Sequence, residues 1–297
     1  MSRKHKIAVL AGDGIGPEVT EQAVKVLKAI AMEFGHLFTF NKAFVGASAI
    51  DKTGNPLPEE TISICQNADA ILFGAIGSPK YDMDPDAKVR PEQGLLRLRK
   101  SLDLYANIRP VIAYEDLLNK SSLKVKQIRD TNILIYRELT GGLYFGEKKL
   151  SNDEASDICE YSRFEIERIA HLAFKAAQTR KGKLTLVDKA NALATSRLWR
   201  KVVQELASQY PAVELNFMYI DNAAMELIIN PRQFDVILTE NMFGDILSEE
   251  ASVIVGSIGL LASASINDEH AMFEPIHGAY GKFANKGIAN PIASILS

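Results

Sequence analysis

The sequence predicts an α/β fold in which largely parallel sheets are joined by βαβ connections. Short apolar runs that read as buried strands alternate with amphipathic segments of helical period along the whole chain, beginning with residues 6–12 and the helix that follows them. This alternation is typical of parallel sheets whose strands are connected through helices. The 297 residues are enough for two lobes or one large α/β unit.

The composition is that of a globular protein and excludes several classes of function. Charged residues are 24% and apolar residues 47%. The net charge is −3, so the overall charge of the chain does not attract nucleic acid or an anionic membrane. No apolar stretch approaches the roughly 20 residues of a membrane span, and the N-terminal apolar run is too short for a signal peptide. Cys65 and Cys159 lack metal or redox spacing, which predicts reduced thiols and a cytoplasmic protein.

The first strand, residues 6–12, leads into GDGIGPE at residues 12–18, where Pro17 is placed to open a helix. The three glycines resemble a dinucleotide-binding fingerprint, but its third glycine would fall at Pro17. The spacing therefore argues against a Rossmann fold. Two interpretations of the glycine turn stay open: close approach of a ligand to the backbone, or a purely structural turn.

Several arginines in the middle of the chain lie near the expected ends of strands and helices. A strand is expected at 68–77, a helix at 91–103 and a strand at 130–139. Arginines at the ends of such elements could clamp a dicarboxylate through bidentate hydrogen bonds, or could simply form a solvated basic surface. The arginines concerned are Arg99, Arg109 and Arg137.

Further along, the pattern predicts a hairpin that could project from the body after Gly141-Gly142, followed by a long helix at 162–180. A strand at 183–188 ends in VDKAN, where Lys189 is either solvent-exposed or, when partly buried near a metal, a general base. A strand at 214–220 follows, and Asp221-Asn222 are predicted to cap the next helix.

The stretch TENMFGDILSEEAS, residues 239–252, follows a buried strand at 234–238. If it is helical, Asp245 and Glu249 lie four apart on one face, where their like charges repel unless a cation lies between them. Mg²⁺ and Mn²⁺ prefer carboxylate oxygens, so the pair indicates a divalent-metal site. The alternative is an ordinary solvated acidic face.

The last segment contains a turn-rich loop at 274–290 and the start of an apolar helix at Asn290-Pro291. Two turns of an apolar helix cannot bury themselves, so we expect the fold to be C-terminally truncated.

Taken together, these motifs resemble those of the β-decarboxylating dehydrogenases, the isocitrate/isopropylmalate family, and most closely its isopropylmalate-specific branch. The resemblance runs from Ile7 to Ser297, and the order and spacing of the motifs make it specific. The motifs are GDGIGPE, GLLRLRKSLDLYANIRP, RELTGGLYFGE, VDKAN, DNAAM, ENMFGDILSEEAS and FEPIHG…KGIANP.

The resemblance implies the family's two-lobed fold, which is not a Rossmann fold. One lobe would comprise 1–103 plus 256–297, on the nucleotide side and C-terminally incomplete; the other, 104–255, would carry dimerisation and the substrate and metal residues. It also implies NAD-dependent oxidative decarboxylation of (2R,3S)-3-isopropylmalate to 4-methyl-2-oxopentanoate in leucine biosynthesis. Alternatives are a tartrate, isocitrate or homoisocitrate dehydrogenase, or an inactive fragment that only dimerises or binds ligand.

The family's site residues carry over by position. The implied substrate-binding residues are Leu95, Arg99, Arg109, Arg137 and Asp221, with Leu95 facing the isopropyl group. The implied acid–base pair is Tyr144 and Lys189, and the implied Mg²⁺ or Mn²⁺ ligands are Asp221, Asp245 and Glu249. In the implied homodimer with shared active sites, Lys189 and Asp221 come from the second subunit. The implied NAD-binding residues are Glu92, Asn191, Glu274, His277, Gly278 and Asn290.

The sequence departs from the family pattern at three places. Glu249 stands where the family has Asp, a longer arm that leaves direct and water-mediated metal contact both open. Lys282 stands where NAD-using isopropylmalate enzymes usually have Asp, which keeps NADP as an alternative cofactor. The family also continues with further helices past the position of Ser297.

Overall fold

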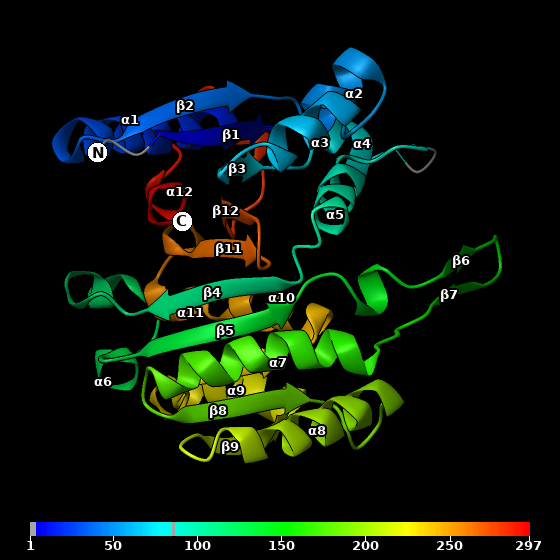
Figure 1. The fold of residues 1–297 in the computed structure, drawn as a ribbon, viewed down its shortest axis with the longest axis vertical. Coiled ribbons are helices and arrows are strands. Elements are labelled where there is room, and N and C mark those ends of the chain that lie inside the picture. The colour runs from blue at the N-terminus through cyan, green and yellow to red at the C-terminus, as the bar shows by residue number, and fades with distance from the viewer. Residues whose placement is uncertain (1–3, 85–86) are drawn as a thin grey trace. The chain divides into compact units, whose positions relative to one another are not determined.

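The computed structural model describes residues 4–84 and 87–297, which form two compact units (Figure 1). The first unit comprises Met1–Leu104 and Gly259–Ser297, and the second Tyr105–Ile258. Strands and helices alternate in both, which confirms the predicted α/β class. No helix in the described part of the chain is long and apolar enough to cross a membrane.

The first unit is built on a mostly parallel sheet with the strand order β2-β1-β3-β12-β11. β1 pairs in parallel with both β2 and β3, β3 pairs in parallel with β12, and β11 and β12 form an antiparallel pair. The strands are β1 (Lys4–Gly12), β2 (Leu37–Lys42), β3 (Ala70–Ala75), β11 (Ala262–Ile266) and β12 (Ala271–Pro275).

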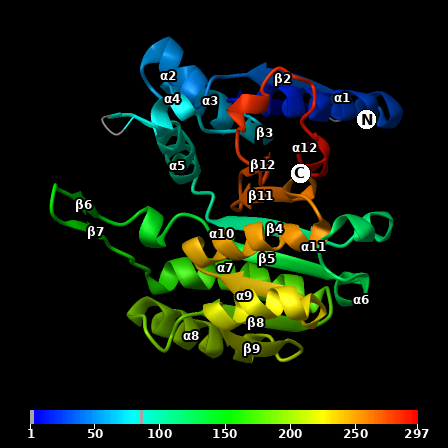
Figure 2. The ribbon, with the colours of Figure 1, turned by 180° about the vertical axis from the view of Figure 1, so that it is seen from behind.

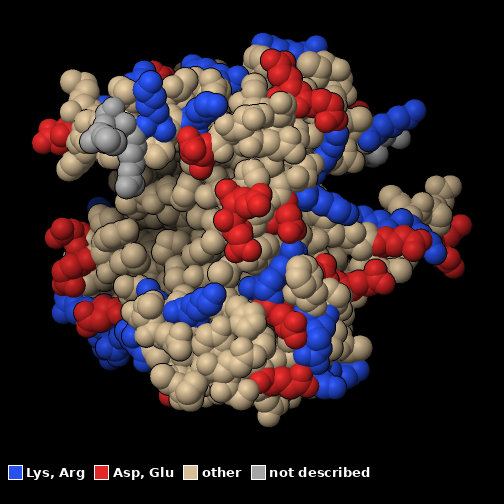
Figure 3. All heavy atoms as spheres, in the orientation of Figure 1, with Lys and Arg blue, Asp and Glu red and all other residues tan. Residues whose placement is uncertain are grey.

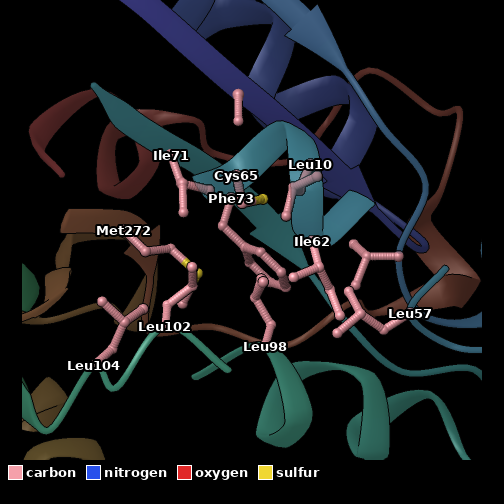
Figure 4. Close-up of a cluster of buried hydrophobic side chains, with 12 residues drawn as sticks. Leu10, Leu57, Ile62, Cys65, Ile71, Phe73, Leu98, Leu102, Leu104 and Met272 are labelled. Carbon is pink, nitrogen blue, oxygen red and sulfur yellow. The ribbon is translucent and has the colours of Figure 1, made fainter. Parts of the chain in front are cut away.

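One hydrophobic cluster of the first unit joins helix α5 (Pro91–Ser101) to the sheet (Figure 4). Leu98 and Leu102 pack there with Phe73 of β3 and Met272 of β12, all nearly or fully buried. Burying one apolar side chain of this size stabilises the folded state by about 1.5–3 kcal/mol. The remaining helices of this unit are α1 (Gly16–Phe34), α2 (Ala47–Thr53), α3 (Glu59–Gln66), α4 (Pro79–Asp82), η6 (Gly281–Phe283) and α12 (Ile292–Leu296).

The second unit has the strand order β4-β5-β10-β8-β9. β4 and β5 are antiparallel, while β5, β10, β8 and β9 run parallel to one another. Helices α7 and α8 cover one face, and α9 and α10 cover the other (Figures 1 and 2). The strands are β4 (Ala106–Ile112), β5 (Asn132–Glu138), β8 (Lys183–Asp188), β9 (Glu214–Tyr219) and β10 (Val236–Thr239).

The main helices of the second unit are α7 (Arg163–Gln178), α8 (Ala194–Leu206), α9 (Ile220–Ile229) and α10 (Asn241–Glu250). Shorter turns are η1 (Glu115–Lys120), α6 (Val125–Ile128), η2 (Gly142–Tyr144), η3 (Ala207–Gln209), η4 (Pro231–Gln233) and α11 (Ser252–Val255), with η5 (Ile258–Leu260) at the junction. The predicted hairpin is present as β6 (Lys148–Leu150) and β7 (Ala155–Asp157), and it extends away from the helices of its unit (Figure 1).

Two local predictions were wrong. Asp221 does not cap a helix, because α9 already begins at Ile220 and Tyr219 occupies the capping position. Asp221 instead lies in the first helical turn, where a carboxylate interacts favourably with the helix dipole. Arg109 is not at an element end but in the middle of β4, because that strand continues to Ile112.

Charged side chains of both signs are interspersed over the visible surface (Figure 3), in keeping with the net charge of −3.

Candidate active site

The second unit gathers a charged cluster around Asp245 of α10. This helix starts directly after the buried strand β10, at its carboxyl end, where ligand sites form in parallel sheets. Gly244 lets the helix lie close to β5, because a Cβ at that position would stand only 2.7 Å from Cγ of Arg137. The Asp245 side chain remains 30% exposed, so solvent reaches part of it.

Two nearly buried arginines converge on the Asp245 carboxylate. Nη1 of Arg137 donates to Oδ1 of Asp245, and Nη1 of Arg109 lies 3.5 Å from the same oxygen. The arginine side chains are only 3% and 6% exposed, so water screens their charges little. Two guanidinium groups thus face one carboxylate, and guanidinium groups suit an anionic ligand.

Neutral side chains fix the orientation of both arginines. Asn107 accepts from Nε of Arg109 at 2.6 Å, and Nη1 of Arg109 donates to the Ser248 hydroxyl at 2.5 Å. Oδ1 of Asn241 accepts from Nε and Nη2 of Arg137 at 3.1 and 2.9 Å. We did not predict these three residues from the sequence. Asn241 could have been predicted, because in TENMFGD it follows a buried strand directly.

Tyr144 joins the same cluster from η2. Its hydroxyl donates a hydrogen bond to Oδ2 of Asp245 at 3.0 Å, and the Arg137 guanidinium carbon lies 5.8 Å from the ring centroid. Burial and the adjacent Asp245 charge raise the pKa of Tyr144. The phenol is therefore held in its protonated form, as a proton donor requires.

Glu240 caps the same helix next to this cluster. Its Oε1 accepts from the backbone N–H of Phe243 at 3.4 Å, and the Cys159 thiol donates to Oε2 at 3.7 Å. Only 6% of Glu240 is exposed, and burial raises its pKa to about 7. The predicted reduced state of Cys159 agrees with this contact, since the thiol has no disulfide partner in the described chain.

Lys189 follows β8 in the same unit. Its Nζ lies 2.6 Å from Oδ1 of Asp221, and this hydrogen bond lowers the pKa of Asp221. Lys189 is held at its backbone by Ser196, whose hydroxyl accepts from the Lys189 N–H at 3.0 Å. The structure thus brings Lys189 and Asp221 together. Asn191, two residues further on, is exposed.

The predicted metal ligands do not meet within the described chain, where no group of three or more His, Cys, Asp or Glu side chains is arranged to hold an ion. Asp245 and Glu249 both lie on α10, one turn apart as predicted. Glu249 and Asp221 are exposed. All three offer carboxylate oxygens, the donors that Mg²⁺ and Mn²⁺ prefer, so their chemistry fits such an ion.

The first unit holds the other predicted site residues. Leu95 of α5 is partly buried and packs against the cluster of Figure 4. Glu92, at the start of α5, lies beside Gly77, since a Cβ there would be 3.4 Å from Glu92 Oε1. Arg99 is paired with Glu274 at 2.9 Å, so two residues assigned to different ligands contact each other.

The remaining nucleotide-side candidates lie after β12. His277 is 5% exposed, burial lowers its pKa, and its Nε2 has no hydrogen-bond partner in the described chain. A buried neutral imidazole with an unpaired nitrogen fits a polar ligand such as a nucleotide. Gly278 and Lys282 are exposed. Asn290 is also exposed, and its Oδ1 accepts from the Ile292 N–H at 3.1 Å.

Comparison with known proteins agrees with this geometry. Residues 6–297 match the family model described as isocitrate/isopropylmalate dehydrogenase. A 3-isopropylmalate dehydrogenase from Bacteroides fragilis is 56% identical over 292 residues, which cover 98% of this chain and 83% of that protein. A protein of the same name from Bacillus subtilis is 54% identical over 301 residues, covering 99% and 82%.

Solved structures are also similar. An isocitrate dehydrogenase from Methylococcus capsulatus superposes with a TM-score of 0.87 at 36% identity, over 98% of this chain and 83% of that one. A β-decarboxylating dehydrogenase from Thermococcus kodakarensis gives a TM-score of 0.78 at 38% identity, covering 98% and 81%.

Proposed function

Because the chain belongs to the isocitrate/isopropylmalate dehydrogenase family, we propose that it oxidatively decarboxylates (2R,3S)-3-isopropylmalate to 4-methyl-2-oxopentanoate with NAD and a divalent metal ion. The product is the keto acid that corresponds to leucine, so the proposed role is in leucine biosynthesis. The observation that carries the proposal is the Arg109–Arg137–Asp245–Tyr144 cluster. It combines two oriented cations for a dicarboxylate with a protonated phenol.

Arg109 and Arg137 would bind substrate carboxylate oxygens. A guanidinium forms bidentate, charge-assisted hydrogen bonds with a carboxylate, and Asn107 and Asn241 already hold these two side chains in place. Preorganised donors need little rearrangement when the substrate arrives, which favours both binding and the reaction. Arg99 is the third arginine proposed to bind a substrate carboxylate.

Lys189 and Tyr144 would move the protons. Lys189 would remove the proton of the 2-hydroxyl of the substrate. NAD, when bound, would supply the oxidant that accepts two electrons and the hydrogen of C2 as a hydride. The resulting β-keto acid releases its 3-carboxylate as CO₂, and Tyr144 delivers a proton to C3. The raised pKa of Tyr144 supports this role, because its phenol is protonated at neutral pH.

Asp221, Asp245 and Glu249 would hold a Mg²⁺ or Mn²⁺ ion. When bound, such an ion supplies positive charge that stabilises negative charge on the substrate's C2 oxygen. Glu92, Asn191, His277, Gly278 and Asn290 are the proposed NAD contacts, and the unpaired Nε2 of His277 is the structural feature that supports this assignment.

A homodimer is part of the proposal. Apolar side chains are exposed on neighbouring helices α9 and α10, with Met225 at 51%, Ile229 at 53% and Ile246 at 55%. Leu150 on the projecting hairpin is 88% exposed. Clustered exposed apolar side chains mark protein interfaces, and a second subunit would bring its own Lys189 and Asp221 to the shared site. Sedimentation velocity of the purified chain tests the dimer.

Substrate choice within the family is the finer question. The second candidate is isocitrate, which the structural similarity to an isocitrate dehydrogenase favours. Leu95 argues for isopropylmalate, because a carboxylate pressed against an apolar side chain loses its hydration without gaining a partner. Tartrate and homoisocitrate belong in the same comparison.

The experiment is NADH formation by the purified chain with Mg²⁺ and a panel of these four substrates. We expect isopropylmalate to give the highest kcat/KM. Leu95→Ser should reduce the ratio of kcat/KM for isopropylmalate to that for isocitrate by about tenfold or more, since a pocket methyl group alone is worth about that much. Turnover of isocitrate or tartrate in preference to isopropylmalate would refute the substrate assignment. An unchanged ratio in Leu95→Ser would show that this side chain does not face the substrate.

A further inference from the structure

Arg99 and Glu274 form a buried ion pair within the first unit. Nη2 of Arg99 donates to Oε1 of Glu274 at 2.9 Å, and their side chains are 9% and 7% exposed. The partners lie 175 residues apart in the chain. A charge-assisted hydrogen bond at this depth is much stronger than a surface ion pair, because water screens it little.

The packing of α5 on β12 brings this pair together. Met272 of β12 packs in the same cluster as Leu98 of α5 and Leu102, which directly follows this helix (Figure 4). Residues two apart on a strand point to the same face, so Glu274 points toward α5 as Met272 does. Arg99 directly follows Leu98 on the helix and reaches the carboxylate there.

Two serines fix Glu274 from its other sides. The Ser265 hydroxyl of β11 donates to the same Oε1 at 3.0 Å, and Ser265 is fully buried. The Ser297 hydroxyl donates to the backbone carbonyl of Glu274 at 2.9 Å. The carboxylate is therefore held before any ligand binds, and it holds Arg99 in turn.

Arg99 keeps donor capacity beyond this pair. A guanidinium carries five N–H donors, and the buried Nε of Arg99 has no hydrogen-bond partner in the described part of the chain. An unsatisfied buried donor is unfavourable, and a ligand acceptor would relieve it. Within the proposed function, the carboxylate of the substrate is such an acceptor.

We propose that Glu274 is a positioning residue that orients Arg99 for the substrate carboxylate, and that it does not bind the nucleotide. Oε1 of Glu274 already accepts from two donors of the protein, Arg99 and Ser265. Recruiting this carboxylate to a nucleotide would leave the Arg99 charge buried without its counter-ion, which is strongly unfavourable. This inference rests on the proposed role of Arg99 in substrate binding.

Glu274→Asp tests the proposal, because it keeps the charge but withdraws the carboxylate by about 1.5 Å, one carbon–carbon bond. The measurements are the Kd of 3-isopropylmalate by calorimetry without nucleotide, steady-state KM for both substrates, and Tm. We expect Kd and KM for isopropylmalate to rise about tenfold to a hundredfold, the value of one charge-assisted hydrogen bond, with KM for NAD changing less than about twofold. Ser265→Ala should shift the same constants in the same direction, but less.

The controls separate the possible roles. Glu269→Asp makes the same change at an exposed glutamate on the β11–β12 turn and should alter none of these constants. In an Arg99→Lys background, Glu274→Asp should raise Kd and KM for isopropylmalate little further, because the two residues act as one unit.

A rise in KM for NAD alone would overturn the proposal in favour of a nucleotide contact. A fall in Tm with every Kd and KM unchanged would show a purely structural pair. A wild-type chain that neither binds nor oxidises isopropylmalate would refute the proposed function and this inference with it, whereas normal wild-type binding with an unchanged Glu274→Asp would refute only the inference.

Discussion

The Tyr144 hydroxyl donates a hydrogen bond to Oδ2 of Asp245 at 3.0 Å, while Oδ1 of the same carboxylate faces Arg109 and Arg137. One side chain thus orders both the proposed proton donor and the proposed anion-binding arginines. Its negative charge also contributes to the raised pKa of Tyr144, after burial itself. Asp245 is therefore the residue on which most of the proposed chemistry depends.

The first prediction is that Asp245→Asn lowers kcat/KM by about a hundredfold or more, a typical loss when a preorganised charged group is removed. The Asn amide keeps the shape of the side chain but removes the counter-ion of two buried guanidiniums and one proposed metal ligand. We also expect the Mg²⁺ concentration for half-maximal activity to rise. Asp268→Asn, at an exposed position, is the matched control. An unchanged Mg²⁺ requirement would show that Asp245 serves the arginines and not the metal.

The second prediction is that Lys189→Ala lowers kcat by about 10²–10⁴-fold, the usual contribution of a general base. Lys189 contacts Asp221 at 2.6 Å, and the Asp221 side chain is 65% exposed, so the loss of Lys189 leaves no buried charge without a counter-ion and the fold should persist. Steady-state kinetics at saturating Mg²⁺ and circular dichroism check both points. Lys201→Ala on α8, which is exposed, should leave kcat unchanged. A decrease in kcat of less than about tenfold would contradict a role in proton transfer.

The fold class and the α10 segment were predictable because their signals are local. Apolar periodicity located β10 and α10 to within a few residues, and a spacing of four placed Asp245 and Glu249 one helical turn apart. The helix start at Ile220 was missed, since one residue of extra helix changes Asp221 from a capping position to the first turn.

The partners of the arginines were not predictable in the same way. Asn241 meets Arg137 across 104 residues of chain, and Glu274 meets Arg99 across 175. No spacing rule reports such pairs, because strand order and helix packing create them. The motif order indicated which residues carry the chemistry, but only the structure shows that Arg99 and Glu274, expected to bind different ligands, contact each other.

The third prediction concerns the pH dependence of stability. Burial raises the pKa of Glu240 from 4.5 to about 7. Between these values the folded state binds more protons than the unfolded state, so this group's contribution makes stability fall as pH rises from about 4.5 to about 7. Above that range the ionised Glu240 costs roughly 3 kcal/mol, at about 1.4 kcal/mol per pH unit.

Glu240→Gln should therefore be more stable than the wild type at pH values well above that range, by up to about 3 kcal/mol, and should lose this advantage toward pH about 5. Urea unfolding followed by fluorescence of Trp199 measures this, since Trp199 is the sole tryptophan and is buried in the second unit. Glu154→Gln on the exposed hairpin should show no such trend. A Glu240→Gln variant that is equally destabilised at every pH would contradict the assignment.

The last prediction concerns the choice of nucleotide. An Asp at position 282 would accept hydrogen bonds from the adenosine ribose and repel a 2′-phosphate, which selects NAD over NADP. Lys282 does neither, and its ammonium attracts a 2′-phosphate instead. In the structure Lys282 lies in η6 and is exposed, with Nζ 5.0 Å from the centroid of the Phe283 ring. An exposed contact between this charge and a phosphate is worth about 1 kcal/mol or less.

That energy is too small for strict selection of NADP, so we expect NAD to remain the working cofactor with a preference within about a hundredfold, or under 3 kcal/mol. Lys282→Asp should shift the preference further toward NAD, mainly by raising KM for NADP, because the new carboxylate repels the 2′-phosphate. Lys286→Asp makes the same charge reversal at another exposed lysine of this loop and controls for a general change in surface charge. Measurement of kcat/KM for both nucleotides in the three proteins decides the matter. If kcat/KM of the wild type is higher for NAD than for NADP by more than about 10⁴-fold, over 5 kcal/mol, a residue other than Lys282 contacts the ribose and selects the nucleotide.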